Sequence, residues 1–204
     1  VSTAADSILS VEGGGINGLA TITSAGTVQG NGSVGAVSVS AGGTLAPGKT
    51  TSTATVYDTL TANGNVSFAD ETSIFSLRIG QTDNDKLTIA GGNSLELNKV
   101  TLSLDLSTYA FTTEDIGRKF TIVIGGASGT GIGNNAFNQG TLYTANNGNQ
   151  FQIYYAAALS GDTVTTGNDI VLEFLAVPEP STWGLIATGF GMLLGATRLR
   201  RNRR

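Results

Sequence analysis

The side chains able to do chemistry form a restricted set in this chain of 204 residues, because it contains no histidine and no cysteine. Their absence removes thiol catalysis, disulfide bonds, histidine-based acid–base catalysis, Ser-His-Asp triads and the usual zinc and copper sites. Carboxylates, lysines, arginines, tyrosines and hydroxyl groups remain. Any reaction or ligand site must be built from these groups.

One acidic group has oxygen ligands at a spacing that could bind Ca²⁺. Asp83, Asn84 and Asp85 follow each other in the chain, and Asp70 and Glu71 lie upstream. The glycine at the sharp turn and the longer ligand series of an EF-hand loop are missing. We therefore interpret the group as a solvated turn closed by Asx hydrogen bonds and expect no metal site.

A polysaccharide-processing enzyme would need a basic side chain beside such acids. Six basic residues precede the C-terminal segment: Lys49, Arg78, Lys86, Lys99, Arg118 and Lys119. None belongs to a recognisable catalytic pattern, so we expect no catalytic residues, no cofactor and no enzyme activity. Tyr143, Tyr154 and Tyr155 could stack on sugar rings, but the Tyr154-Tyr155 pair also fits a strand with one ring in the core and one at the surface.

The composition predicts an all-β protein. Glycine, threonine, serine and asparagine make up 89 of the 204 residues, and only 13% are charged. These residues have poor helix propensity, whereas 40% hydrophobic residues are enough for a core. From Gly13 to Gly48 there are eleven glycines, which separate apolar–polar strings of two to five residues. Such short strands favour a solenoid over residues 1–56, with turns at Gly30, Gly32, Gly42 and Gly43.

Longer strands are predicted over residues 57–176, where apolar and polar residues alternate with period two. The alternating sets begin at Leu87, Leu95, Val100, Phe120, Phe151 and Ile170. A hairpin turn at Asn63-Gly64 would favour an antiparallel β-sandwich as the alternative fold. Residues 125–150 are rich in glycine and asparagine, and we interpret them as a long surface loop with one poor strand.

The C-terminal segment, residues 177–204, differs from everything before it. Residues 177–183 read Val-Pro-Glu-Pro-Ser-Thr-Trp, in which Pro178 and Pro180 prevent continuous helix or strand. Residues 183–197 are uncharged and predict one transmembrane helix, with Trp183 at the membrane interface and Gly191 and Gly195 as a helix-packing step. A positive-inside cluster follows, formed by Arg198, Arg200, Arg201, Arg203 and Arg204.

This segment resembles the PEP-CTERM sorting signal of Gram-negative bacteria. The likeness rests on the Pro-Glu-Pro motif, the short glycine-rich apolar span and the terminal arginines, in that order. It implies recognition by an exosortase, a membrane sorting enzyme that cuts near Pro-Glu-Pro. By this resemblance Val177, Pro178, Glu179 and Pro180 are the recognition residues. It also implies an inner-membrane-anchored precursor and delivery to the cell surface or extracellular matrix.

The body resembles the repeats of autotransporter-associated β-strand proteins. Residues 30–34, 37–39 and 42–48 carry this likeness, and residues 85–91 and 167–172 show similar strings. It implies a right-handed parallel β-helix. The chain departs from that family because no membrane β-barrel follows, and the sorting segment stands in its place.

Three functions from different classes follow from these patterns. The leading one is an exported structural or adhesive surface protein, the second is a binding module for extracellular polysaccharide, and the third is a Ca²⁺-dependent polysaccharide lyase or hydrolase. Residues 1–177 carry 14 acidic and six basic side chains, and this negative charge argues against a nucleic-acid partner. The expected partners are an exosortase, the inner membrane transiently, and extracellular polysaccharide.

Overall fold

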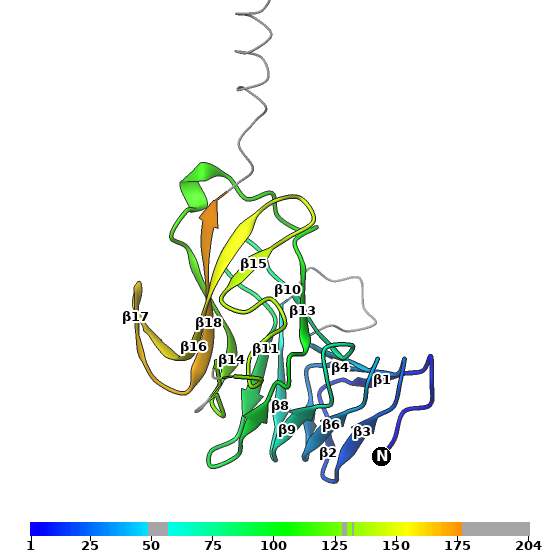
Figure 1. Cartoon of the computed structure of the whole chain (residues 1–204). Coiled ribbons are helices and arrows are strands. Elements are labelled where there is room, and N and C mark those ends of the chain that lie inside the picture. The colour runs from blue at the N-terminus through cyan, green and yellow to red at the C-terminus, as the bar shows by residue number, and fades with distance from the viewer. Residues whose placement is uncertain (49–56, 128–129, 132, 177–204) are drawn as a thin grey trace, which may run out of the picture.

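The fold is all-β. The computed structural model describes residues 1–48, 57–127, 130–131 and 133–176. Within these residues the only helical element is the 3₁₀ turn η1 (Thr113–Asp115). Short strands lie side by side at one end of the molecule, and long curved strands form the other end (Figure 1).

The first fourteen strands pass in cyclic order through three sheets, and neighbours within each sheet are three strands apart in sequence. The first sheet contains β1 (Ile8–Val11), β4 (Thr27–Gly30), β7 (Thr44–Pro47), β10 (Ile74–Arg78) and β13 (Thr101–Asp105). The second contains β2 (Gly15–Ile16), β5 (Ser33–Val34), β8 (Thr59–Ala62), β11 (Lys86–Ile89) and β14 (Lys119–Ile124). The third contains β3 (Ala20–Ile22), β6 (Val37–Val39), β9 (Val66–Phe68) and β12 (Leu95–Glu96).

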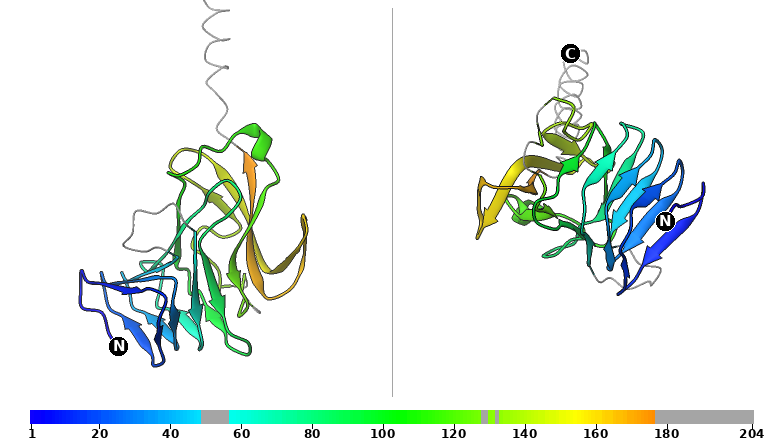
Figure 2. Two further views of the ribbon diagram at one scale, coloured as in Figure 1. Left: turned by 180° about the vertical axis from the view of Figure 1, so that it is seen from behind. Right: turned by 90° about the horizontal axis from the view of Figure 1, so that it is seen from below.

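Every pairing among these fourteen strands is parallel. We call one passage through the three sheets a coil, and the coils lie in a row (Figure 2). The parallel pairing predicted for the short strands after Gly13 is therefore confirmed as far as Gly48, and residues 49–56 lie outside the described residues. Successive coils advance by 19, 17, 30 and 27 residues along the first sheet. Such uneven spacing hides the repeat from a search for a fixed period.

The coils are held together by rows of inward side chains in register. In the first sheet the row runs through Leu9, Val28, Leu45, Phe75 and Leu102. The last four of these are buried, whereas Leu9 is only partly buried. Alternation with outward threonine and serine fits strands that have one face in the core and one in water.

The Asn63-Gly64 turn is not a hairpin, which corrects the sequence prediction. Strands β8 and β9 on either side of it belong to different sheets, so the turn is a corner within one coil. A Cβ on Gly64 would lie 2.8 Å from the backbone of Ala36 in the neighbouring coil. Glycine is needed here because the two corners pack backbone to backbone.

Antiparallel pairing appears where the second sheet continues beyond β14. The added strands are β18 (Asp169–Ala176), β16 (Gln150–Ser160), β15 (Leu142–Thr144) and β17 (Thr163–Thr166). Strand β18 lies between β14 and β16, and β17 pairs with β16 as a hairpin. The predicted sandwich is thus wrong for the coils. All antiparallel strand pairs of the described chain lie in this part, and elsewhere only an isolated antiparallel bridge joins Ile79 and Asn84.

The core of the antiparallel part is aromatic. Phe111 packs against Phe120, Phe151 and Phe174, with ring centroids 6.0, 5.4 and 4.7 Å away. The prediction of a surface loop over residues 125–150 is wrong around Phe137. This side chain is fully buried and stacks on Phe75 with 6.1 Å between ring centroids. This segment covers the last coil rather than lying loosely on the surface.

Candidate functional site

The C-terminal segment leaves the body from a central strand. Ala176, the last residue of β18, pairs with Gln150 of β16, and Val177 is the next residue. On the other side of β18, the Phe174 amide donates to the Arg118 carbonyl at 2.8 Å, and the Gly117 amide donates to the Phe174 carbonyl at 2.8 Å. The sorting segment is therefore joined to a strand that is held from both sides.

A carboxylate beside this strand fixes the neighbouring turn. Asp115 of η1 accepts hydrogen bonds from the Tyr109 hydroxyl, at 2.9 and 3.0 Å, and from the Thr112 amide at 2.9 Å. It also pairs with Arg118 at 2.7 Å. Burial raises the pKa of Asp115, but these hydrogen bonds and the guanidinium outweigh burial and hold the pKa below its ordinary value. We call Ala176, Gln150 and residues 112–118 the exit end.

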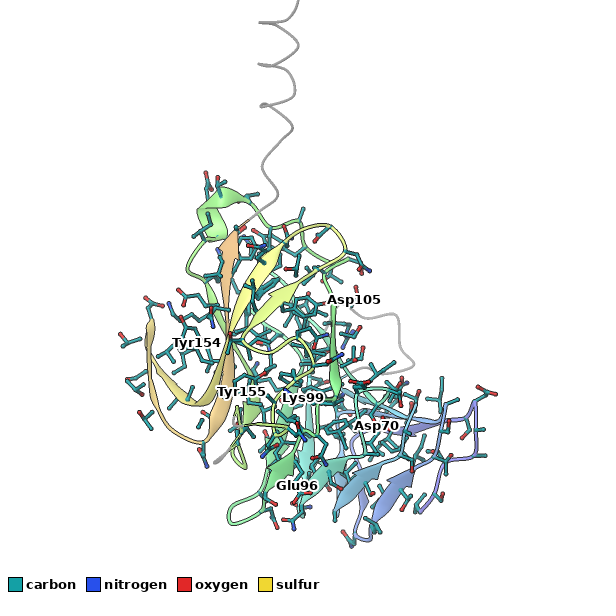
Figure 3. The ribbon with its side chains drawn as sticks, in the orientation of Figure 1. Asp70, Glu96, Lys99, Asp105, Tyr154 and Tyr155 are labelled. Atoms are coloured by element: carbon teal, nitrogen blue, oxygen red, sulfur yellow. The ribbon has the colours of Figure 1, made fainter. Side chains whose placement is uncertain are left out.

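A polar hollow of about 520 Å³ lies at the corners of the later coils, where Figure 3 labels Asp70 and Lys99. It is lined by Ala69, Asp70, Glu71, Thr72, Asn98, Lys99 and Asn134. The Thr72 amide and hydroxyl donate to Asp70 at 2.9 and 2.6 Å, which lowers the pKa of Asp70. We call it the corner hollow.

The chain is turned into the corner hollow by an unusual pair of residues. Asn98 and Lys99 have φ of 45° and 65°, in the left-handed region that favours glycine. Asn98 offsets this with a hydrogen bond from its side-chain amide to the Phe68 carbonyl at 2.8 Å, and the Lys99 amide donates to Asn134 at 2.9 Å. Asp70, Glu71 and Lys99 were candidates by residue type, whereas Asn98 and Asn134 could be found only from the coil register.

The predicted acidic turn is not solvated as expected. Asp85 is buried and accepts two hydrogen bonds from the Arg78 guanidinium, at 2.7 and 2.9 Å. Arg78 also donates to the Gly48 carbonyl at 2.7 Å, which lies 30 residues away in sequence. Asp85 raises the pKa of Arg78 through this hydrogen bond. No group of three or more acidic side chains that could hold a metal ion exists among the described residues.

Most of the basic residues considered for catalysis are in ion pairs. Besides Arg78 with Asp85 and Arg118 with Asp115, Lys86 pairs with Asp83 at 2.5 Å and Lys119 with Glu173 at 3.3 Å. The structure brings Lys99 to the corner hollow. Lys49 lies outside the described residues.

The tyrosine pair divides between core and surface contacts. The Tyr155 hydroxyl accepts the Phe137 amide at 3.0 Å and donates to the Gly140 carbonyl at 2.6 Å, and burial raises the pKa of Tyr155 to about 12. The Tyr154 hydroxyl donates to Glu173 at 2.6 Å, which raises the pKa of Tyr154. Both side chains line a second hollow of about 320 Å³ beside the β16–β17 hairpin (Figure 3). Their hydroxyls are thus engaged within the protein.

Residues 176–204 match the family model of the PEP-CTERM protein-sorting motif. No curated protein matches the chain. The matched segment begins at the last residue of β18 and does not extend into the body, so the likeness to autotransporter-associated repeats gains no support from it. A motif of this kind implies an exported protein with a C-terminal signal that an exosortase recognises and that is processed at the membrane.

The individual residues of the sorting segment lie outside the described residues. These are Val177, Pro178, Glu179, Pro180, Trp183, Gly191, Gly195 and the five arginines from Arg198 to Arg204. Within the described part of the chain, no helix is long and apolar enough to span a membrane.

Proposed function

We propose that this protein is an exported structural or adhesive component of the cell surface or extracellular matrix, delivered and processed by an exosortase. The observation that carries the proposal is the PEP-CTERM match over residues 176–204. Outward threonine and serine side chains such as Thr21, Ser38 and Ser67 of the third sheet give the all-β body hydroxyl groups on its surface, which supports a scaffold that contacts other molecules over that surface. The final location and the adhesive role are parts of the proposal.

In this proposal, the motif, the apolar span and the arginines of the sorting segment have separate roles. Pro178 and Pro180 hold the motif extended for a protease-like cleft, and Glu179 supplies the charge that the enzyme reads. Residues 183–197 span the membrane with Trp183 at one interface, although 15 residues at about 1.5 Å per residue reach only about 22 Å. Arginines at the cytoplasmic end extend this reach by snorkelling.

The body is, in this proposal, a right-handed three-sided β-solenoid that ends in an antiparallel cap. The cyclic order of β1 to β14 through three parallel sheets supports the solenoid. The right hand is supported by the strong preference of parallel crossover connections for that hand. A stacked scaffold of this kind presents long rows of outward side chains, which suits a structural or adhesive surface.

No enzymatic activity is part of the proposal. This part of the proposal is supported by four ion pairs, in which basic side chains considered for catalysis pair with carboxylates of the body. A lyase and hydrolase screen on acidic and neutral polysaccharides, with and without Ca²⁺, tests this point. Turnover of any of them would replace the scaffold function by an enzymatic one.

The corner hollow supports polysaccharide binding as a second candidate function. It offers carboxylate acceptors on Asp70 and Glu71, amide groups on Asn98 and Asn134, and the ammonium of Lys99. Such mixed donors and acceptors suit sugar hydroxyl and carboxylate groups. On a glycan array the chain should bind an acidic polysaccharide, and Lys99→Ala should weaken that binding by about tenfold, the equivalent of about 1.4 kcal/mol. Equal binding by Lys86→Ala and wild type is the matched control, because Lys86 lies on β11 and does not line the hollow. No binding at all would leave only the scaffold function.

The sorting proposal is tested by replacing both prolines of the motif. Pro178→Ala with Pro180→Ala should leave the full-length chain in the membrane and slow release by about tenfold or more, the effect of about 1.4 kcal/mol in activation free energy. The reason is that alanines let the following helix extend backwards through the motif, which closes it to an extended-peptide cleft. Release is measured by fractionation of cells that also express the exosortase.

A second variant, Glu179→Gln, tests the charge separately, because it removes the negative group and keeps the shape. Thermal unfolding of the body should be the same in both variants, because all pairing partners of β18 lie within residues 1–176. Release of the double variant at the wild-type rate would show that Pro-Glu-Pro is not the recognition element and that the tail is only an anchor.

A further inference from the structure

The sorting motif begins almost immediately after the last strand of the body. Ala176 is the last residue of β18, and only Val177 separates it from Pro178. Because an extended chain spans at most about 3.6 Å per residue, Pro178 lies within about 7 Å of Ala176 and Pro180 within about 14 Å. A protein that binds the motif must therefore work directly beside the exit end.

Strand β18 cannot lengthen this reach by much. The side chain of Phe174, two residues before Ala176, is fully buried, and its ring centroid lies 4.7 Å from that of Phe111 and 5.2 Å from that of Phe151. Its amide and carbonyl are both hydrogen-bonded to the turn before β14. Separating β18 from its neighbours beyond Leu175 would expose this ring and break these hydrogen bonds. At most two residues of the strand can thus be added to the free chain.

An enzyme cleft is thicker than the gap between the motif and the body. Grooves that hold extended peptides are formed by sheet edges and helices. One helix with its side chains is about 10–12 Å across, and packed sheets lie about 10 Å apart. Both dimensions exceed the distance of about 7 Å that the chain allows between Ala176 and Pro178. The wall of a cleft closed on Pro178 therefore covers part of the exit end.

The exit end presents an apolar side chain on a well-held turn. Ile116, which follows η1, is 53% exposed. It precedes Gly117, whose amide donates to the Phe174 carbonyl at 2.8 Å, and Figure 1 shows η1, in green, beside the tip of β18. Asp115 holds the turn through hydrogen bonds and an ion pair with Arg118. A side chain on such a turn loses little backbone entropy when a partner covers it.

We propose that the exit end is a docking surface for the exosortase, with Ile116 as its apolar anchor. This inference rests on the proposed sorting function, since it requires that an exosortase binds the motif. The surface exists only when β18 is paired and η1 lies beside it. The enzyme therefore processes chains with a folded body in preference to chains whose last strand is not in place.

The enzyme is a closer occupant of this surface than the membrane. The predicted membrane span begins at Trp183, seven residues after Ala176, so the chain allows up to about 25 Å between them, against about 7 Å for Pro178. Glu114, which is exposed two residues before Ile116, is repelled by anionic lipid headgroups. The distance and the charge both favour a protein partner.

Photo-crosslinking tests the contact directly. With a benzophenone-bearing phenylalanine in place of Ile116, the full chain expressed with the exosortase should link to the enzyme on illumination. The matched control carries the same group in place of Ile124, which is 39% exposed at the other end of β14, and should give about tenfold less product. Links to lipid alone, or equal linking from both positions, would overturn the proposal.

The rate of release shows whether the contact contributes to processing. Ile116→Lys should slow release by about tenfold at an unchanged unfolding temperature, whereas Ile124→Lys should be released at the wild-type rate. A flexible linker of about twelve glycine and serine residues between Ala176 and Val177 lets the enzyme bind the motif away from the body. In the linker chain, Ile116→Lys should change release by less than twofold. A tenfold effect that persists there would mean that the substitution does not act through the closeness of motif and body, which contradicts the proposal.

Failure of this inference and failure of the sorting proposal give different results. If cells with the exosortase release the unmodified chain and Ile116→Lys at the same rate, the exit end is not a docking surface and the sorting proposal stands. If these cells do not release the unmodified chain, the sorting proposal is wrong and the docking surface is wrong with it.

Discussion

At the scale of single residues, the structure replaces a solvated acidic turn by a buried ion pair. The Asp85 carboxylate accepts hydrogen bonds from Nε and Nη2 of Arg78, and the Gly48 carbonyl accepts one from Nη2. A Cβ at Gly48 would collide with Asp85 and with the Asp58 carbonyl, and its φ is +71°. The sequence shows an acidic run and a distant arginine, but their meeting depends on coil register, which local patterns do not encode.

Tyr155 leads to a prediction about alkaline stability. Its pKa of about 12 in the folded chain exceeds the ordinary value near 10, so folding favours the protonated phenol. This contribution is fully present below pH 10 and is lost as the pH rises from about 10 to about 12. Tyr155→Phe should therefore show a smaller drop in the free energy of unfolding between pH 9 and pH 11 than wild type does. Urea unfolding at the two pH values measures the difference.

The same variant has a cost at neutral pH. It leaves the Phe137 amide and the Gly140 carbonyl without the hydroxyl that joins them. Leaving such groups unpaired costs about 1–3 kcal/mol. If Tyr155→Phe matches wild type at pH 7 and loses stability with pH as wild type does, the hydroxyl does not occupy the buried position described.

At the scale of elements, period-two alternation predicted the strands better than their partners. The alternating sets that begin at Leu95, Val100, Phe120, Phe151 and Ile170 overlap observed strands. Alternation is the same for parallel and antiparallel strands, so it could not show that β8 and β9 belong to different sheets. Corner geometry decides this, and it depends on contacts such as that of Gly64 with Ala36 between coils.

The segment before β15, residues 133–141, shows why a polar sequence that caps a sheet can be mistaken for a surface loop. Its amide side chains are polar because they pair with backbone, and the single Phe137 between them completes the core. In the sequence, asparagine and glutamine that cap a sheet look the same as those in a solvated loop. Only the position of β13 as a sheet edge distinguishes them.

Gln139 provides the prediction at this scale. Gln139→Ala removes both hydrogen bonds to Leu102, a buried residue of β13, and should destabilise the fold by about 1–3 kcal/mol. Thermal unfolding should shift down by several degrees, since about 1 kcal/mol corresponds to about 2–4 °C in a chain of this size. Gln152→Ala is the control, because that amide reaches only the adjacent Ile153 carbonyl among the described contacts. Equal shifts for the two variants would show that Gln139 does not act as a strand substitute.

At the scale of the whole molecule, the sorting segment and the body meet at one strand. The sequence predicts a boundary between Ala176 and Val177, because Pro178 and Pro180 are incompatible with a continuing strand. It could not show that the strand before the boundary is central in its sheet, since strand order is a property of the fold. The tail is therefore attached to a strand with partners on both sides and not to a free edge.

This attachment predicts how the chain tolerates truncation. A chain ending at Ala176 should unfold at the same temperature as the full chain within about 1 °C, because β18 finds its partners β14 and β16 within residues 119–160. A chain ending at Asn168 lacks β18 and separates β14 from β16. It also removes Phe174, whose ring lies 4.7 Å from Phe111 and 5.2 Å from Phe151. Loss of a buried phenylalanine alone costs about 3–5 kcal/mol, a large part of the stability of an ordinary domain.

The two truncations are compared by circular dichroism during heating and by the binding of a dye specific for exposed apolar surface. The chain ending at Asn168 should melt without a cooperative transition in its antiparallel part and should bind the dye at room temperature, because Phe111 and Phe151 lose their cover. The parallel coils before β14 should keep their strand signal, since all of their pairing partners lie before Asn168 and remain in this chain. A chain ending at Asn168 that melts cooperatively at the full-length temperature would show that β18 is not the strand on which the antiparallel part closes, and that the sorting segment leaves from an element the body does not need.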